Sequence, residues 1–114
     1  DLDIDRMKKA AKHIVGRHDF KSFRATDGMA EKNTVRTVKK IKIEKKGDLI
    51  YIDIEADGFL YNMVRNIVGT LVEVARGRFT VDDVDEILRK KDRKFCGPTM
   101  AAKGLCLEKV RYGK

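Results

Sequence analysis

The residue best suited to chemistry is Arg65, which lies in the stretch DGFLYNMVRNIVGTLVEVARG at 57–77. At helical spacing this stretch has a broad apolar face and a polar stripe, and Arg65 falls at the border between them. A guanidinium at the edge of an apolar helix can hold a carboxylate or a phosphate with two parallel hydrogen bonds. The alternative from spacing alone is an ordinary surface salt bridge, which contributes about 0–1 kcal/mol to stability.

The two faces of this stretch differ clearly in residue type. Its apolar face holds Leu60, Met63, Val64, Ile67, Val68, Leu71, Val74 and Ala75. Its polar stripe holds Asn62, Asn66, Gly69, Glu73 and Arg76. The apolar face is wide enough to form the spine of a core. The pattern therefore predicts a long helix from about Phe59 to Arg76, ending at Gly77.

The other titratable residues are weaker candidates for chemistry than Arg65. His18 adjoins Asp19, and such a pair could orient a base, but no Ser or Cys stands next to it. His13 lies among lysines. Asp57 precedes Gly58, which is more typical of a turn or cap than of a catalytic acid. The sequence has no nucleotide-binding loop, serine-hydrolase motif or metal cluster, so we expect neither cofactor nor metal.

The charge balance favours a polyanionic partner. The chain has 26 Lys and Arg against 18 Asp and Glu, a net charge of +8 and a pI of about 9.6. Residues 1–46 carry 14 basic against 7 acidic side chains, whereas residues 47–93 carry 7 against 10. Arg36, Lys40 and Lys42 share one parity of a predicted strand, which predicts a positive row for RNA. The alternative is a heavily charged surface with no ligand.

Length and cysteine usage limit the class of protein. A chain of 114 residues is enough for one compact domain, 1–114, and not for two. Its two cysteines, Cys96 and Cys106, form neither a zinc motif nor a disulfide framework. No signal peptide or membrane-spanning run is present, so we expect a cytoplasmic protein. The start at Asp1 without an initiator Met favours a fragment of something longer.

Periodicity predicts an α+β domain. We expect a helix over 5–16, an irregular segment over 17–24, strands over 35–44 and 49–56, and a strand over 105–112. The residues Lys46-Gly47-Asp48 signal a hairpin, and the parity break at Val38 indicates a bulge near Lys39-Lys40. Besides the long helix, Thr80 caps another one. This order predicts helices packed on one face of an antiparallel sheet.

The 58–77 run resembles the C-terminal half of TruA-type tRNA pseudouridine synthases. Four further strings match the family in its own order: HDFKSFR at 18–24, VRTV at 35–38, GPT at 97–99 and GLCLEKVRY at 104–112. The resemblance spans nearly the whole chain, and its central motif is long and specific.

This resemblance implies a fold in which two related halves share one continuous sheet, with the active cleft between them. It implies that the uracil N1–C1′ bond is broken and the base rejoined through C5, without cofactor or metal. The implied substrate is uridine in the anticodon arm of tRNA, turned out of its stack. The implied assembly is a homodimer that grips tRNA with both subunits.

The site residues that carry over are few. Arg65 matches the family's Arg that pairs with and orients the catalytic aspartate, and Leu105 matches an apolar wall against the target base. The family's aspartate motif, GRTDxGVH, belongs to the N-terminal half and does not occur here. Asp27 lacks its flanking pattern, and Tyr61 does not replace the family's active-site tyrosine. We therefore expect the fragment to be inactive alone; the alternative is a stand-alone RNA-binding module without catalysis.

Overall fold

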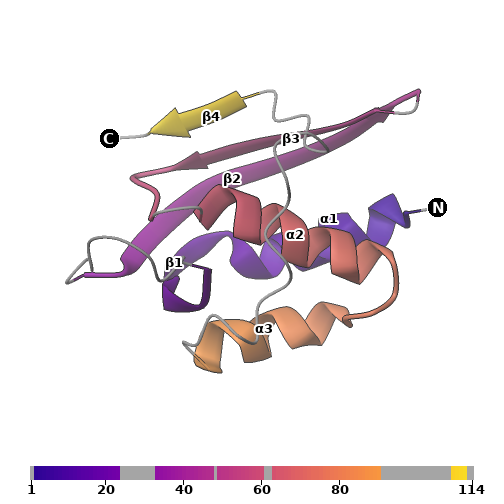
Figure 1. Ribbon diagram of the computed structural model, residues 1–114. Coiled ribbons are helices and arrows are strands. Elements are labelled where there is room, and N and C mark those ends of the chain that lie inside the picture. Colours follow the sequence, from indigo (N-terminus) through magenta and orange to yellow (C-terminus); the bar gives the residue numbers. More distant parts are fainter. Residues whose placement is uncertain (1, 24–32, 48, 61–62, 91–108, 113–114) are drawn as a thin grey trace.

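The computed structural model describes residues 2–23, 33–47, 49–60, 63–90 and the backbone of 109–112 (Figure 1). The elements in chain order are α1 (Ile4–Ile14), β1 (Gly16–Asp19), the 3-10 helix η1 (Lys21–Phe23), β2 (Val35–Lys46), β3 (Leu49–Ala56), α2 (Met63–Ala75), α3 (Val81–Lys90) and β4 (Lys109–Tyr112). The strands form one sheet in the order β1-β2-β3-β4. In Figure 1 the helices lie on one side of this sheet, with α3 farthest from it. The predicted α+β architecture is confirmed.

The β2–β3 hairpin carries the predicted turn and the predicted bulge. Gly47 has a φ of 61°, the left-handed conformation that a tight hairpin turn requires and that glycine adopts without steric cost. Along the hairpin, the register passes from Val38 opposite Ala56 to Lys40 opposite Glu55. One residue of β2 is therefore extra, which reverses the side-chain parity of the strand at that point.

Two strands differ from the prediction. The segment expected to be irregular contains β1, which pairs antiparallel with β2 from Gly16 opposite Val38 to Asp19 opposite Val35. Its sequence GRHD has no apolar alternation, so only the pairing reveals the strand. The last strand pairs with β3 in parallel, because the chain crosses back through α2 and α3 before it re-enters the sheet. The predicted part over 105–108 lies outside the described residues.

The caps of α1 and α3 follow the local sequence. The Asp3 carboxylate accepts a hydrogen bond from the Arg6 amide at 3.1 Å, which caps α1. This helix ends at Ile14, two residues before the predicted end, because the backbone is already extended at Val15. Thr80 caps α3 as predicted: its Oγ1 accepts from the Asp83 amide at 3.1 Å, and its own amide donates to Asp83 Oδ2 at 2.7 Å.

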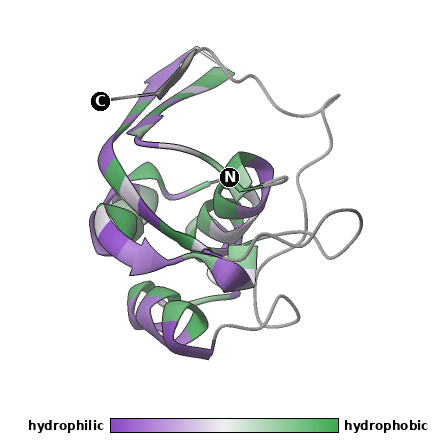
Figure 2. Cartoon of the chain, turned by 90° about the vertical axis from the view of Figure 1, so that its left-hand side faces the viewer, coloured by the Kyte–Doolittle hydropathy of each residue, from purple (hydrophilic) through white to green (hydrophobic). Residues whose placement is uncertain are grey.

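Helix α2 is the core helix, but it begins later than predicted. Its start at Met63 follows a connection whose first residue still bonds to the sheet. The Asp57 amide donates to the Thr37 carbonyl at 3.0 Å, and the Thr37 amide donates to Asp57 Oδ1 at 2.9 Å. Every residue from Asn66 to Ala75 is buried, so Asn66, Gly69 and Glu73 of the polar stripe face protein as well. Figure 2 shows the strands banded in hydrophobic and hydrophilic residues around this interior.

Candidate functional site

The described residues place Arg65 in the first turn of α2, where its side chain is partly buried. The turn before it is closed by the Met63 amide, which donates to the Leu60 carbonyl at 3.0 Å. Leu60 and Met63 are themselves core residues. Arg65 therefore projects from a firmly packed base at the N-terminal end of the central helix.

The first turn of α2 carries a cation where a helix favours an anion. The N-terminal end of a helix has a partial positive charge, which acidic side chains stabilise and basic ones do not. Accordingly, α1 has Asp5 in its first turn and α3 has Asp82 and Asp83, whereas α2 has no acidic residue there. Arg65 makes no ion pair or side-chain hydrogen bond with any described residue. An anion supplied from elsewhere would satisfy both Arg65 and the helix end.

A buried amide next to Arg65 fastens this helix to its neighbours. Asn66 has no exposed surface, and its Nδ2 donates to the Phe23 carbonyl at 2.6 Å. Ser22, also in η1, donates through Oγ to the Ile87 carbonyl of α3 at 2.6 Å. The 3-10 turn η1 is thus tied to α2 on one side and to α3 on the other. These contacts fix the rotation of α2 about its own axis and therefore the direction in which the Arg65 side chain extends from the helix.

Sequence reasoning missed this role of Asn66. The pattern placed it on a polar stripe with Gly69 and Glu73, and such stripes are usually read as solvent-facing. A signal was available, because a stripe that mixes glycine with short polar side chains also suits the close approach of another segment. The Glu73 carboxylate on the same stripe is buried too, with Arg76 and Arg78 at 3.6 and 3.5 Å.

The predicted positive row does not lie on one face of the sheet. Before the bulge, Arg36 has the same parity as Val38, which is buried on the helix side. After the bulge, Lys40 and Lys42 have the opposite parity and lie on the outer face. Arg36 Nη1 donates to the Asn33 and Val35 carbonyls, both at 2.8 Å. The prediction of a shared face is wrong, because the extra residue reverses the alternation between positions 38 and 40.

On the outer face the lysines meet acidic residues. Lys40 is directly opposite Glu55, and Lys42 is directly opposite Asp53. Lys42 Nζ also lies 2.7 Å from Glu44 Oε1. This hydrogen bond raises the pKa of Lys42 and lowers the pKa of Glu44. The outer face is therefore a ladder of opposite charges and carries less positive field than its lysines suggest.

The remaining candidates have structural roles or fall elsewhere. His18 Nε2 lies 3.3 Å from the Val15 carbonyl, and His13 Nδ1 lies 2.9 Å from Asp85 Oδ2 across α1 and α3. Asp57 acts as a turn residue, as its bonds to Thr37 show. Three residues weighed from the sequence, Leu105, Asp27 and Tyr61, lie outside the described residues.

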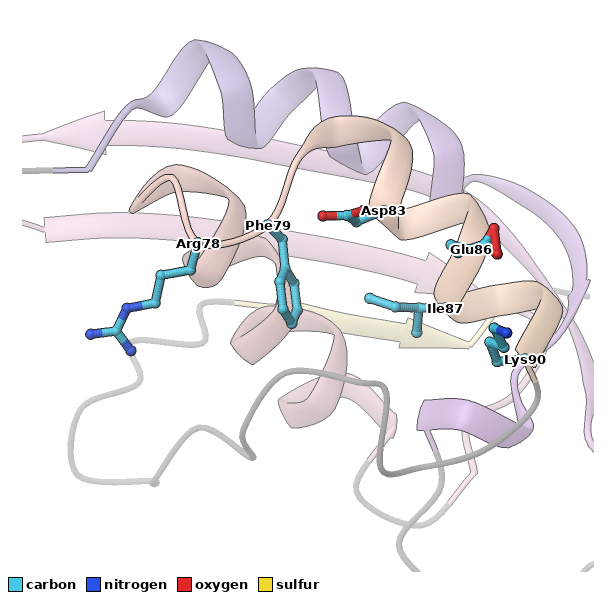
Figure 3. A pocket seen from close by; sticks show the side chains of 6 residues that line it. All are labelled: Arg78, Phe79, Asp83, Glu86, Ile87 and Lys90. Carbon is cyan, nitrogen blue, oxygen red and sulfur yellow. The ribbon is translucent and has the colours of Figure 1, made fainter.

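A pocket of about 370 Å³ opens along α3 and the connection that precedes it (Figure 3). It is lined by Arg78, Phe79, Asp83, Glu86, Ile87 and Lys90. The charges around its apolar floor are balanced, two basic against two acidic. The pocket extends along α3 to Ile87, whose carbonyl accepts the hydrogen bond from Ser22 of η1.

Comparison with known proteins identifies the family. A family model described as tRNA pseudouridine synthase matches residues 10–113. The chain belongs to the tRNA pseudouridine synthase family. It is 46% identical over 111 residues to tRNA pseudouridine synthase A of Clostridium kluyveri and 50% identical over 111 residues to that of Thermoanaerobacter sp. strain X514, which in each case covers 97% of this chain and 45% of the relative. The enzyme of Caulobacter vibrioides is 45% identical over 113 residues, 99% of this chain and 45% of its own.

The chain thus spans a little under half the length of these synthases. In the part of the chain that the structure describes, no helix is long and apolar enough to cross a bilayer.

Proposed function

We propose that this chain is the C-terminal half of a tRNA pseudouridine synthase that converts uridine to pseudouridine in the anticodon arm of tRNA. The observation that supports this best is the cation in the first turn of α2, a turn that has no acidic residue. Family membership explains it, because the N-terminal half of such an enzyme would bring an aspartate to Arg65. The domain 1–114 is then one half of the site, and we expect it to be inactive alone.

Arg65 would act on the aspartate rather than on the base. Two parallel N–H bonds from a guanidinium fix a carboxylate in one orientation and favour its ionised form. The positive end of α2 adds to the same field. The carboxylate would then stay ionised and in one orientation while the uracil is detached from C1′ and rejoined through C5. Leu105 would form an apolar wall beside the base.

The proposal also covers the cofactor requirement, the location, the assembly and the tRNA contacts of the full-length enzyme. The reaction needs neither a redox change nor a metal, so we expect none to be required. We expect the full-length enzyme to be a cytoplasmic homodimer, with Arg36, Lys40 and Lys42 among the residues that meet tRNA. Their division between two faces of the sheet means that they would meet different parts of the RNA.

The test is Arg65→Lys in the full-length enzyme, assayed by chemical labelling of pseudouridine in unmodified tRNA. Lysine keeps the charge but not the two-pronged geometry. Turnover should fall by at least 100-fold while tRNA affinity changes less than threefold, on the order of the losses seen when an oriented catalytic contact is removed. The matched control is Arg89→Lys, an exposed arginine paired with Glu86 on α3, which should change neither.

Two outcomes would overturn the proposal. Equal losses of turnover and affinity in Arg65→Lys would make Arg65 a binding residue. Turnover by the isolated 114-residue chain would remove the need for an aspartate from another half.

The second candidate is an RNA-binding module without catalysis, favoured by the 14 basic against 7 acidic side chains in residues 1–46. It predicts that the full-length product binds tRNA, with a steep salt dependence, but forms no pseudouridine. Pseudouridine formation by the full-length protein excludes it.

A further inference from the structure

A second groove lies between α1 and the part of β2 that follows the bulge. It has a volume of about 380 Å³, and its lining residues are Lys8, Ala11, Lys12, Val15, Ile41, Lys42 and Ile43. Its floor is aliphatic and its rim is basic. Val15, at 38% exposure, is one of two large apolar residues that the described chain leaves exposed.

The groove is open along the strand as well as above. Strand β1 pairs with β2 only between Val35 and Val38, so from Lys40 onward no described strand pairs with the edge of β2 opposite β3. Helix α1 packs below this uncovered part of β2, as Figure 1 shows. An extended, charged chain could therefore lie along the groove without displacing any described element.

The rim lysines of α1 are not neutralised. Lys8 and Lys12 are exposed, and neither makes an ion pair with a described residue. Lys40 and Lys42 on the sheet, by contrast, face Glu55 and Asp53 directly. Among these four lysines, Lys8 and Lys12 on α1 are therefore the ones without an acidic partner in the described part of the chain.

We propose that this groove binds the phosphate backbone of the tRNA substrate, at a contact separate from the Arg65 site. The proposal rests on the proposed function, which supplies the RNA. Lys8 and Lys12 are four residues apart on one helix face, which puts their Cβ atoms roughly 5–6 Å apart, so each can meet a different phosphate. Their aliphatic stems would lie along the floor while the ammonium groups reach the anions.

The floor indicates which part of the RNA binds. None of the seven lining residues is aromatic, so the groove offers no platform for stacking an unpaired base. Contacts to phosphates alone carry no direct sequence information. The groove is therefore expected to hold a segment of backbone, and to increase affinity without selecting the target uridine.

An acidic peptide is the other ligand that a basic rim over an aliphatic floor could take. RNA is favoured because the synthase family already acts on tRNA, and because a backbone supplies one negative charge per nucleotide to closely spaced lysines. A peptide would need a run of Asp and Glu to do the same.

The experiment measures tRNA affinity of the full-length enzyme against salt concentration. The test variant is the double substitution Lys8→Gln with Lys12→Gln. The control is Lys9→Gln, an exposed lysine of the same helix that does not line the groove. The log–log salt slope should fall in magnitude by about 1.4–1.8 in the double variant, that is 0.7–0.9 for each phosphate contact. The control should change it by less than about 0.4.

The outcomes separate this inference from the proposed function. Pseudouridine formation by the wild-type enzyme tests the function, whatever the variants do. If the wild type is active and the double variant keeps its slope, the groove proposal is overturned. It is also overturned if Lys9→Gln has half the effect of the double variant, since any lysine of α1 would then serve equally. Two results with the double variant would assign the groove to a protein partner and overturn the proposal too. One is a change in its oligomeric state, measured by sedimentation. The other is a loss of poly-glutamate binding while the salt slope for tRNA is unchanged.

Discussion

Asn66 offers a direct test of how the helix that carries Arg65 is held. The residue has no exposed surface, and its amide donates to the Phe23 carbonyl at 2.6 Å. Asn66→Ala removes that donor and leaves the carbonyl buried without it, which costs about 1–3 kcal/mol. Since a domain of this size is stable by roughly 5–15 kcal/mol, the loss should be easy to measure. We expect the melting temperature to fall by about 4 °C for each kcal/mol lost.

Asn66→Asp adds a dependence on pH. The new side chain has nearly the same shape, but its ionised form cannot donate to Phe23 and would place a charge in the core. Burial raises the pKa of an acid above its unfolded value of about 3.9. Below that value the acid is neutral in both states, so the penalty is small. The penalty should therefore grow as the pH rises from about 4 towards 7. Urea denaturation followed by circular dichroism at both pH values measures it.

Thr70→Val is the matched control. Thr70 Oγ1 donates at 3.0 Å to the Asn66 carbonyl, which the helix ladder already bonds, so that carbonyl keeps a partner after the substitution. Its cost should stay below about 1 kcal/mol. If Asn66→Ala costs less than about 0.5 kcal/mol, or no more than Thr70→Val, the amide does not fasten η1 to α2 and the reasoning is refuted.

Three further substitutions test other parts of the structure. Glu73→Gln should change the free energy of unfolding by no more than about 1 kcal/mol, because the two arginines near that carboxylate are at least half exposed and regain water; a loss above about 3 kcal/mol in urea denaturation would contradict this. Lys42 lowers the pKa of Glu44 below its ordinary 4.5. The contribution of this pair to the stability of the fold is therefore present above pH 4.5 and lost as the pH falls through the lowered pKa. The difference in urea midpoint between wild type and Glu44→Gln should accordingly shrink as the pH falls below 4.5, and a difference that does not change with pH would argue against the pairing. Gly77, which follows α2, has a φ of 85°, so Gly77→Ala should cost about 1–2 kcal/mol and Gly77→Asn less; equal melting temperatures for the two variants would disagree.

Several features of this protein follow from short-range sequence signals. The caps at Asp3 and Thr80, the turn at Gly47 and the bulge after Val38 each depend on a few neighbouring residues, and each is present in the structure. Their physics is local, because a side chain bonds the nearest amide or a glycine relieves a backbone clash.

Other features depend on which segments meet. β1 has no strand signal of its own and exists through its pairing with Val35–Val38. Asn66 and Glu73 lie on what the periodicity predicts as an outer stripe, yet a second layer of structure covers them. Periodicity shows that two faces of a helix differ, but it does not show whether the polar face meets water or protein.

The candidate site divides in the same way. The sequence by itself determined the family, through the 58–77 run, and identified Arg65 as the cation of interest. Only the tertiary structure decided that Arg65 lies in a first helical turn without an acidic residue. It alone placed Arg36 on the opposite face from Lys40, and Lys8 and Lys12 beside an open groove. The physical reason is that charge is a property of each residue, whereas compensation of charge depends on neighbours that are distant in the chain.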